Sequence, residues 1–256
     1  MKKTVFLTDL DNTLVYSYKH AKADDICVEI AHDKPQGFIS ERGYALLKTL
    51  TEHMTVIPVT TRSTAQYERI RWENPPKYAA VANGGILLDG GESDGAWRKE
   101  TETLIAAAEA ELSQVEKQLA AEDNYIRIRR VDDTYVFAYT KEGVDIAECE
   151  KRYSGRTSLQ VTASGRKLYF FPQGIDKGEA AKRLKARFQA ERVIAAGDSV
   201  IDLPMLAQAD VAIVPNGYLA KRLPQSVEVK VCDRENFAEY VLETALAYIE
   251  RLCHNT

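Results

Sequence analysis

Two aspartates spaced two residues apart are the first residues in this chain whose type and position suggest chemistry. Asp9 and Asp11 lie in the segment Asp9-Leu10-Asp11-Asn12-Thr13, directly after a short apolar run at residues 4–8. Asp9 could attack phosphorus and form an aspartyl-phosphate. Asp11 could protonate the leaving oxygen and later activate water, and the like charge nearby would raise its pKa. The alternative is a turn in which the aspartates accept local hydrogen bonds.

A second acid pair follows another apolar run, at residues 192–196. Asp198 and Asp202 are spaced i, i+4 in the segment Gly197-Asp198-Ser199-Val200-Ile201-Asp202, so both can face one point if Asp202 lies in the first helical turn. Crowded carboxylates need a cation, and a few hard oxygen ligands suit Mg²⁺. The alternative is an N-capping Asp198 beside a favourable charge at a helix N-terminus.

Lys177 and Thr60 are candidates to hold a phosphoryl group. Lys177 begins a predicted helix, where a cation opposes the helix dipole at a cost of about 0.3–1 kcal/mol if exposed. A phosphate or the aspartates would supply the missing anion; the alternative is a solvated lysine. Thr60, with Thr61 and Arg62, ends the apolar run at residues 55–59, and a hydroxyl with N–H groups at a helix start can bind phosphate. Taken alone, this run is more typical of an N-cap.

The elements that must position these residues are short strands and amphipathic helices. The three apolar runs are nearly continuous, which is typical of strands buried on both faces of a parallel sheet. In such sheets, ligands bind beyond the carboxyl ends of the strands. Helical spacing of apolar residues occurs at 40–52, 176–189 and 237–252. This alternation predicts an α/β fold with a doubly wound, Rossmann-like parallel-sheet core, although Pro58 is awkward within a strand.

The middle of the chain has a different pattern. After the turn Asn83-Gly84-Gly85, a helix is predicted at 103–121, then two β-hairpins at 125–140 and 157–171 with a helix at 144–153 between them. This is α+β patterning. We therefore predict an inserted α+β cap domain at 84–171, within a catalytic core made of residues 1–83 and 172–256.

These motifs, in this order, resemble the haloacid dehalogenase-like phosphohydrolase superfamily, whose first motif is DxDx(T/V) and whose fourth is GDxxxD. The insert resembles the large α/β cap of the branch that includes sucrose-phosphate and mannosyl-phosphoglycerate phosphatases. The resemblance implies that Asp9 is the nucleophile, Asp11 the general acid/base, and that Thr60 and Lys177 hold the phosphoryl group. It implies a Mg²⁺ cofactor bound by Asp9, Asp11 (through its backbone carbonyl), Asp198 and Asp202.

The chain departs from this branch at two positions. Thr61 replaces a glycine of the usual Thr-Gly-Arg motif, and Ile201 replaces an asparagine of the usual GDxxND motif. Asn216, in a later Pro-Asn-Gly turn, matches another polar position of the branch. The resemblance places further phosphate- or substrate-binding residues at Leu10, Thr61, Arg62 and Asn216.

The predicted cap offers candidates for substrate specificity. Along residues 125–129, Ile126 and Ile128 share one face of a strand, and Tyr125, Arg127 and Arg129 share the other. Taken alone, this alternation is typical of a solvated outer face. The functional interpretation places Arg127 and Arg129 over the active site, where they bind a second anionic group of the substrate. We expect the alternating aromatics Tyr135, Phe137 and Tyr139 to pack in a core.

Composition limits the class of protein. The 256 residues carry a formal net charge of −4, which disfavours a nucleic-acid partner, and no apolar stretch is long enough for a membrane span. Four scattered cysteines and a short N-terminal apolar run predict a cytoplasmic protein without a signal peptide. We expect a phosphatase acting on a small phosphorylated metabolite, such as a sugar phosphate. The alternatives are a phosphotransferase, a signalling phosphoprotein or a non-catalytic binding protein.

Overall fold

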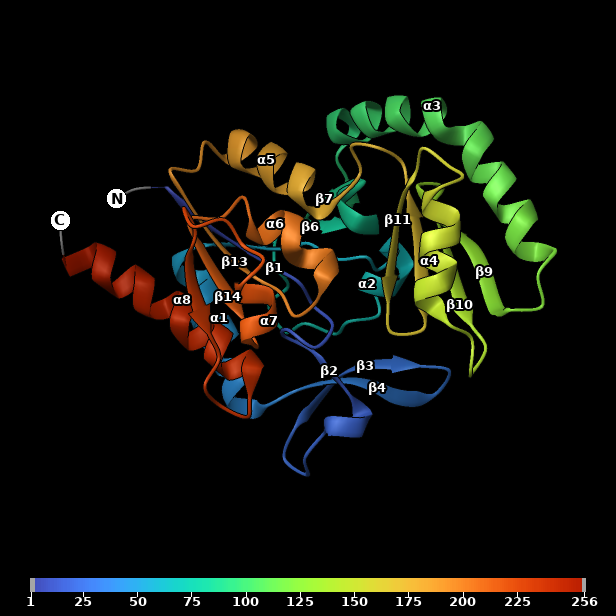
Figure 1. Cartoon of the computed structure of the whole chain (residues 1–256). Coiled ribbons are helices and arrows are strands. Elements are labelled where there is room, and N and C mark those ends of the chain that lie inside the picture. Colours follow the sequence, from blue (N-terminus) through green and yellow to red (C-terminus); the bar gives the residue numbers. More distant parts are fainter. Residues whose placement is uncertain (1–2, 255–256) are drawn as a thin grey trace.

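A five-stranded parallel sheet forms the centre of the molecule (Figure 1). The computed structural model describes residues 3–254, with side chains up to residue 249. The strands lie in the order β15 (Glu228–Val231), β14 (Val211–Val214), β13 (Arg192–Ala196), β1 (Thr4–Thr8) and β5 (Thr55–Pro58), and all neighbours are parallel. Three of these, β1, β5 and β13, are the predicted strands. Their apolar side chains are buried, as continuous apolar runs require.

Pro58 is accommodated because β5 is the last strand of this sheet. The next residue, Val59, donates its N–H to the carbonyl of Thr8 on β1 at 2.8 Å. Since alternate residues of a strand point their N–H groups to opposite sides, the Pro58 nitrogen points away from β1. The proline therefore removes no hydrogen bond from the parallel ladder.

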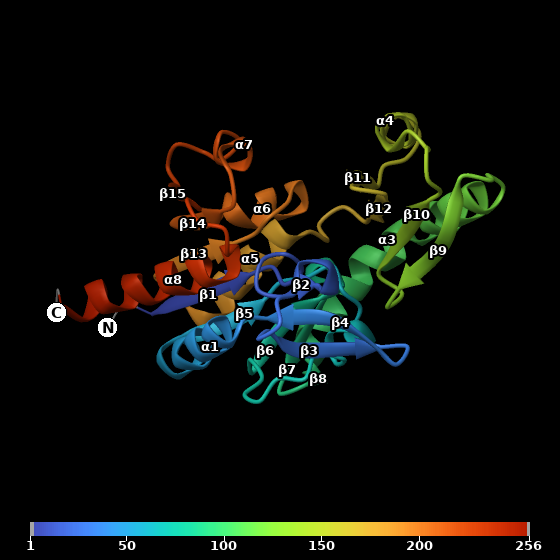
Figure 2. The same ribbon diagram turned by 90° about the horizontal axis from the view of Figure 1, so that it is seen from below.

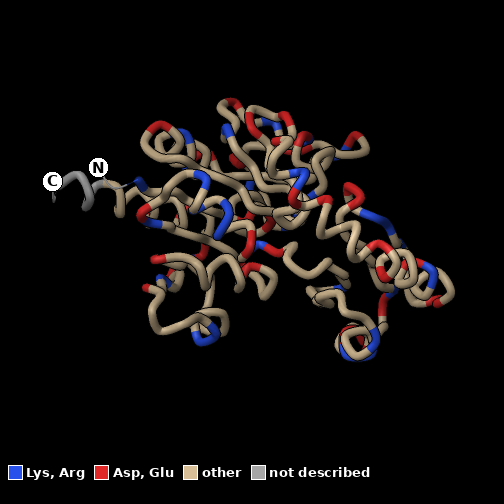
Figure 3. The backbone as a smooth tube through the Cα atoms, turned by 90° about the horizontal axis from the view of Figure 1, so that it is seen from above, with Lys and Arg blue, Asp and Glu red and all other residues tan. Residues whose placement is uncertain are grey.

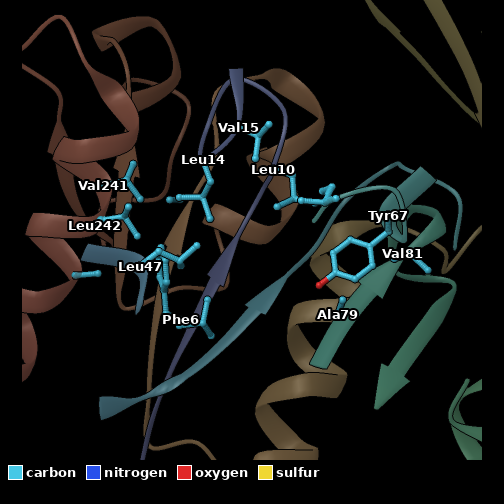
Figure 4. Packing of buried hydrophobic residues seen from close by; sticks show 14 of the residues in the cluster. Phe6, Leu10, Leu14, Val15, Leu47, Tyr67, Ala79, Val81, Val241 and Leu242 are labelled. Atoms are coloured by element: carbon cyan, nitrogen blue, oxygen red, sulfur yellow. The ribbon is translucent and has the colours of Figure 1, made fainter. Parts of the chain in front are cut away.

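Helices cover both faces of the sheet, so the predicted doubly wound core is confirmed. The helices are α1 (Glu41–His53) and α8 (Phe237–His254) on one face, and α5 (Lys177–Phe188) and α6 (Leu203–Leu206) on the other. Phe6 of β1 packs with Leu47 and Val241 in one cluster (Figure 4), whereas its neighbour Leu7 packs with Leu184 in the other. No described helix is long and apolar enough to cross a membrane.

A separate antiparallel sheet lies beside the core and contains the predicted hairpins. Its strands lie in the order β11 (Gln160–Ser164), β12 (Lys167–Phe171), β10 (Tyr135–Thr140) and β9 (Tyr125–Val131). One face packs on α3 (Gly95–Ala120) and α4 (Ile146–Ser154) in its own hydrophobic cluster, which includes Leu112 and Phe170. We call this unit the cap. Helix α3 begins well before the predicted start, because Asp94 caps it and Gly95 occupies its first position.

The start of the predicted insert pairs with a strand that precedes it. Strand β7 (Ile86–Asp89) is antiparallel to β6 (Tyr78–Val81) and to the short β8 (Glu92–Ser93), and β6 lies beside β5. Between β6 and β7, the helical turn η2 (Ala82–Gly84) holds Gly84 against α5, where a Cβ would lie 2.4 Å from that of Ala180. The strands at 86–93 are therefore continuous with β6.

A third antiparallel sheet was not predicted. It consists of β2 (Tyr16–Ser17), β4 (Lys34–Ile39) and β3 (Ile26–Ala31), in that order, and a helical turn, η1 (Tyr18–His20), follows β2. The β3–β4 hairpin turns at His32 and Asp33, which both have positive φ, as two-residue hairpin turns require. Figure 2 shows this hairpin extending from the core towards the strands of the cap.

Candidate active site

Three carboxylates meet at the carboxyl ends of β1 and β13. Asp9 follows β1 directly, and its N–H donates to the carbonyl of Ala196 at the end of β13, at 2.9 Å. Asp198 lies two residues beyond β13, and Asp202 ends the helical turn η3 (Val200–Asp202). The carboxylate oxygens of Asp9, Asp198 and Asp202 lie within 4.8 Å of one another. The structure thus brings together three of the four predicted metal-binding aspartates.

Lys177 supplies the positive charge inside this cluster. It is the first residue of α5, which Asp176 caps by accepting the N–H groups of Gly178 and Glu179. The Lys177 Nζ lies 2.5 Å from Asp9 Oδ1 and 2.6 Å from Asp202 Oδ1, and its side chain is 2% exposed. Burial alone would lower the pKa of Lys177, but Asp202 and Asp9 raise it above the ordinary value. The lysine is therefore charged, and its unfavourable position at a helix N-terminus is explained by its two carboxylate partners.

Asp202 is held more tightly than the other two acids. Its Oδ2 accepts hydrogen bonds from the backbone N–H groups of Asp198 and Ser199 and from the Ser199 hydroxyl, at 2.9–3.1 Å. Its side chain is fully buried. Gly197 permits this arrangement, because a Cβ at residue 197 would lie 2.4 Å from that of Asp202. Asp202 therefore orients the loop after β13, which leaves Asp9 and Asp198 freer to bind a cation.

The electrostatics of the cluster fit a divalent cation. Burial, and then the neighbouring carboxylates, raise the pKa of Asp9 despite the opposing effect of Lys177. Burial, and then Asp202, raise the pKa of Asp198 to about 7. Burial and the mutual repulsion of the carboxylates thus both disfavour the ionised forms, and a cation between them would offset both effects. Mg²⁺ fits this donor set, because it takes one or two carboxylates and completes its shell with water or phosphate oxygens.

Asp11 is turned away from this cluster and pairs with Arg62. The Arg62 Nε and Nη2 donate to Asp11 Oδ2 and Oδ1 at 3.0 and 2.7 Å, and Nη2 also lies 2.8 Å from Glu29 Oε2. Burial raises the pKa of Asp11, but the hydrogen bonds and charge of Arg62 outweigh burial, so the pKa lies below its ordinary value. The prediction that like charge raises this pKa is therefore wrong, since a cation lies closer to Asp11 than the acids do.

The segment after β5 combines a buried hydroxyl with a helix cap. Thr60 is fully buried, and its Oγ1 accepts the N–H of Arg62 at 3.1 Å. Ser63 caps α2 (Thr64–Tyr67) in a capping box with Gln66, so the N-cap interpretation applies to Ser63. The carbonyl of Thr61 accepts the hydroxyl of Tyr135 from the cap at 2.5 Å. The segment therefore joins the core to the cap.

The side chains of two predicted binding residues, Leu10 and Asn216, stabilise the fold. The Leu10 side chain is fully buried in the main hydrophobic cluster, so only its backbone could meet a ligand. Asn216 caps α7 (Gly217–Ala220), and its Oδ1 accepts the N–H groups of Tyr218 and Leu219. These contacts explain both residues without a substrate.

A cleft lies between the cap sheet and the β3–β4 hairpin. It consists of two adjoining pockets of about 860 and 710 Å³, which share Asp11 and Arg62 among their lining residues. The hairpin contributes Glu29, Lys34 and Gln36. Asp11, on the core side, and the cap sheet therefore line one cleft.

Arg127 and Arg129 both line this cleft, where Arg127 is exposed to solvent and Arg129 is half-buried. Arg129 Nη2 donates to Gln66 Oε1 at 2.8 Å, and its guanidinium lies 5.4 Å from the centre of the Phe137 ring. Tyr135 is buried in the main core as expected, and it lines the cleft together with the half-buried Phe137 and Tyr139.

A β-bulge corrects the predicted faces at the start of β9. The pairing of β9 with β10 shifts between Tyr139 and Thr140, which places Tyr125 opposite Thr140. Tyr125 consequently packs on the helical side of the cap, and Ile126 lies in the cleft with 60% of its surface exposed. A bulge re-aims the side chains beyond it in this way.

Known proteins resemble this chain in two respects: a family profile matches part of its sequence, and solved structures share its fold. The profile of the haloacid dehalogenase-like hydrolase family matches residues 92–214, which include the cap, Lys177, Asp198 and Asp202. No curated protein sequence matches the chain.

Solved structures share the fold over nearly the whole chain. A sucrose-phosphatase from Synechocystis sp., in complex with sucrose and phosphate, has 15% identity and a TM-score of 0.66, over 98% of this chain and 99% of that one. A C-terminal domain of trehalose-6-phosphate phosphatase from C. albicans has 14% identity and a TM-score of 0.57, over 97% and 92%. A trehalose-6-phosphate phosphatase related protein has 11% identity and a TM-score of 0.58, over 99% and 100%. Residues 92–214 are thus similar to haloacid dehalogenase-like hydrolases, and the chain as a whole shares the fold of these solved structures.

The sequence alone did not reveal Glu29, Gln66 or Lys167 as parts of the site. Glu29 is 4% exposed and pairs with Arg69 as well as Arg62. A signal existed in the largely apolar run of residues 26–31 before His32 and Asp33, but Pro35 and Gly37 are unusual in a strand and concealed the hairpin.

Proposed function

We propose that this protein is a Mg²⁺-dependent phosphatase that hydrolyses a small phosphomonoester, such as a sugar phosphate, through an aspartyl-phosphate on Asp9. The observation that carries the proposal is the buried Asp9–Lys177–Asp202 arrangement with Asp198 beside it. The names of the sucrose- and trehalose-6-phosphate phosphatases support a sugar phosphate as the substrate class. The three described cysteines are free, which supports a reducing compartment such as the cytoplasm.

The chemistry follows from the positions of the side chains. An Asp9 oxygen forms a bond to phosphorus while the bond from phosphorus to the ester oxygen breaks. Lys177, which contacts Asp9 directly, stabilises charge on the phosphoryl oxygens, and Thr60 at the neighbouring strand end supplies a hydroxyl. Mg²⁺, held by Asp9 and Asp198 with Asp202 behind them, would neutralise further charge on the phosphoryl group.

Asp11 moves the protons in both steps. It gives a proton to the leaving oxygen in the first step. Because the pair with Arg62 holds Asp11 ionised, Asp11 must first separate from Arg62 and take up a proton from solvent. In the second step, ionised Asp11 accepts a proton from the water that attacks phosphorus, and the bond between phosphorus and Asp9 breaks. Free phosphate and the original form of both aspartates result.

Hydrolysis of p-nitrophenyl phosphate tests the proposal. Activity should depend on Mg²⁺, and Asp9→Asn should reduce kcat by at least about a thousandfold, because the nucleophile is lost. Asp24→Asn is the matched control, since it makes the same change on an exposed loop. An inactive wild type, or an active Asp9→Asn variant, would contradict the proposal. Added sugar alcohols distinguish a hydrolase from a phosphotransferase, because a transferase would phosphorylate them.

A further inference from the structure

The face of the cap sheet that lines the cleft carries cations and aromatic rings in register. Across the strands, Tyr139 of β10 pairs with Arg127 of β9 on one side and with Lys167 of β12 on the other. In the next row, Phe137 pairs in the same way with Arg129 and Tyr169. Side chains opposite one another in a sheet are neighbours, so the face presents three cations around adjacent rings.

The cleft is positively charged although the chain is not. Acidic and basic residues are interspersed over the backbone as a whole (Figure 3), and the net charge is −4. The lining of the cleft instead contains seven lysines and arginines and only two carboxylates. Both carboxylates are already paired: Asp11 with Arg62, and Glu29 with Arg62 and Arg69. The cations on the cap face are therefore in excess.

The excess is specific to this face of the cap. Among the described residues, neither Arg127 nor Lys167 forms an ion pair, whereas Arg130, on the opposite face of β9, pairs with Glu109 and Glu116. Arg129 donates to Gln66 and lies beside the Phe137 ring, but it too forms no ion pair among the described residues. Three cations without an acidic partner on one face indicate that an anionic ligand supplies the missing charge.

We infer that the substrate's alcohol portion carries a second anionic group, a carboxylate or a second phosphate, which Arg127, Arg129 and Lys167 bind. This inference rests on the proposed function, since it assigns the phosphoryl group to Asp9. Guanidinium groups bind carboxylate and phosphate oxygens in pairs, and the rings of Phe137 and Tyr169 offer an apolar surface for the carbon skeleton between the two anions.

Matched substrates test the inference. 6-Phosphogluconate and glucose 6-phosphate differ in a carboxylate at the far end, and fructose 1,6-bisphosphate and fructose 6-phosphate differ in a second phosphate. The wild type should prefer one anionic member by at least about tenfold in kcat/KM, and the member it prefers identifies the group. The double variant Arg127→Ala/Lys167→Ala should raise KM for that member by about 10–100-fold and should raise KM for its neutral counterpart by much less. Arg130→Ala, on the same strand, is the control and should leave the preference intact.

A binding measurement without turnover tests this inference independently of the proposed phosphatase activity. Calorimetry with Asp9→Asn measures the affinity for the same four compounds without turnover. At least tenfold tighter binding of an anionic member, lost in the Arg127→Ala/Lys167→Ala background, supports the inference even if p-nitrophenyl phosphate is not hydrolysed. Equal affinity for anionic and neutral members, or equal loss on all four compounds, would overturn it while leaving the phosphatase proposal to its own assay.

Discussion

The acid cluster and the cleft face of the cap differ in how their charges are held. Asp202 accepts three hydrogen bonds at one oxygen, Lys177 contacts two carboxylates, and both side chains are buried. The cations of the cap face, by contrast, have few protein partners, and Arg127 is exposed. The side chains of the cluster are thus held in place by backbone hydrogen bonds and by a lysine at a helix N-terminus. The cations of the cap face, in contrast, remain available to a ligand. We therefore expect the acid cluster to carry out the reaction and the cleft face of the cap to select the substrate.

The largest effect is expected from replacing Lys177, which removes the only cation of the acid cluster among the described residues. Lys177→Met leaves Asp9 and Asp202 buried without their cation, and losing one partner of a buried pair typically costs about 3–5 kcal/mol. We expect that loss of unfolding free energy in urea without metal, together with loss of phosphatase activity. Lys182→Met, on the exposed side of the same helix, should change stability by less than about 0.5 kcal/mol. Equal stability of the two variants would show that the cluster is not fixed by Lys177.

An intermediate effect concerns pH and metal. Because the pKa of Asp198 is raised from 3.8 to about 7, the folded protein binds more protons than the unfolded chain between these values. Without metal, stability should therefore fall as the pH rises through this range. Mg²⁺ binds the ionised carboxylates, so it should raise Tm most at the upper end of the range.

Thermal unfolding in chelator and in Mg²⁺, from pH 4 to pH 8, checks this prediction. Asp198→Asn removes one of the two acids with a raised pKa, the other being Asp9, and should weaken the pH dependence of the metal-free protein. A wild-type curve that is unchanged by Mg²⁺ at every pH would contradict a metal site in the cluster.

The smallest expected effect concerns the cap, because it removes one contact between the cap and the core. Asp132 Oδ2, in the β9–β10 turn, accepts the N–H and hydroxyl of Thr64 at 2.6 and 2.9 Å. Asp132→Ala should cost about 1 kcal/mol of stability and raise KM modestly, with kcat for p-nitrophenyl phosphate nearly unchanged. Asp133→Ala is the matched control, because its φ is also positive and the same backbone strain applies. If both variants behave alike, backbone strain accounts for the effect and the contact with Thr64 does not.

The two regions also differ in how well the sequence predicted them. The strands that carry Asp9, Thr60 and Asp198 were evident, since buried parallel strands are short apolar runs and their polar ends meet at one edge. Gly197 and Asp202 lie close together and are only five residues apart in the chain. The geometry of this loop is therefore determined largely by nearby residues, which the sequence shows directly.

The cleft could not be predicted in the same way, because its contacts join distant segments. The pairing of Asp11 with Arg62 and Glu29 depends on tertiary packing, and it reversed the expected direction of the Asp11 pKa shift. The bulge after Tyr125 moved Ile126 into the cleft, and single-strand alternation carries no sign of such an irregularity. The limits of the inserted domain remain a prediction, with strands at 86–93 paired to the strand before it.

The position of β1 has a consequence for how the protein is made. β1 is flanked by β5 on one side and by β13 on the other, where Thr4 pairs with Arg192. During synthesis, β1 leaves the ribosome long before β13, so its second neighbour is missing until the chain between them has emerged. An unpaired apolar strand edge is prone to aggregation, and contacts so distant in sequence form slowly. We expect the nascent chain to depend on chaperones until the residues of β13 emerge, and the cap, whose contacts are local, to fold first.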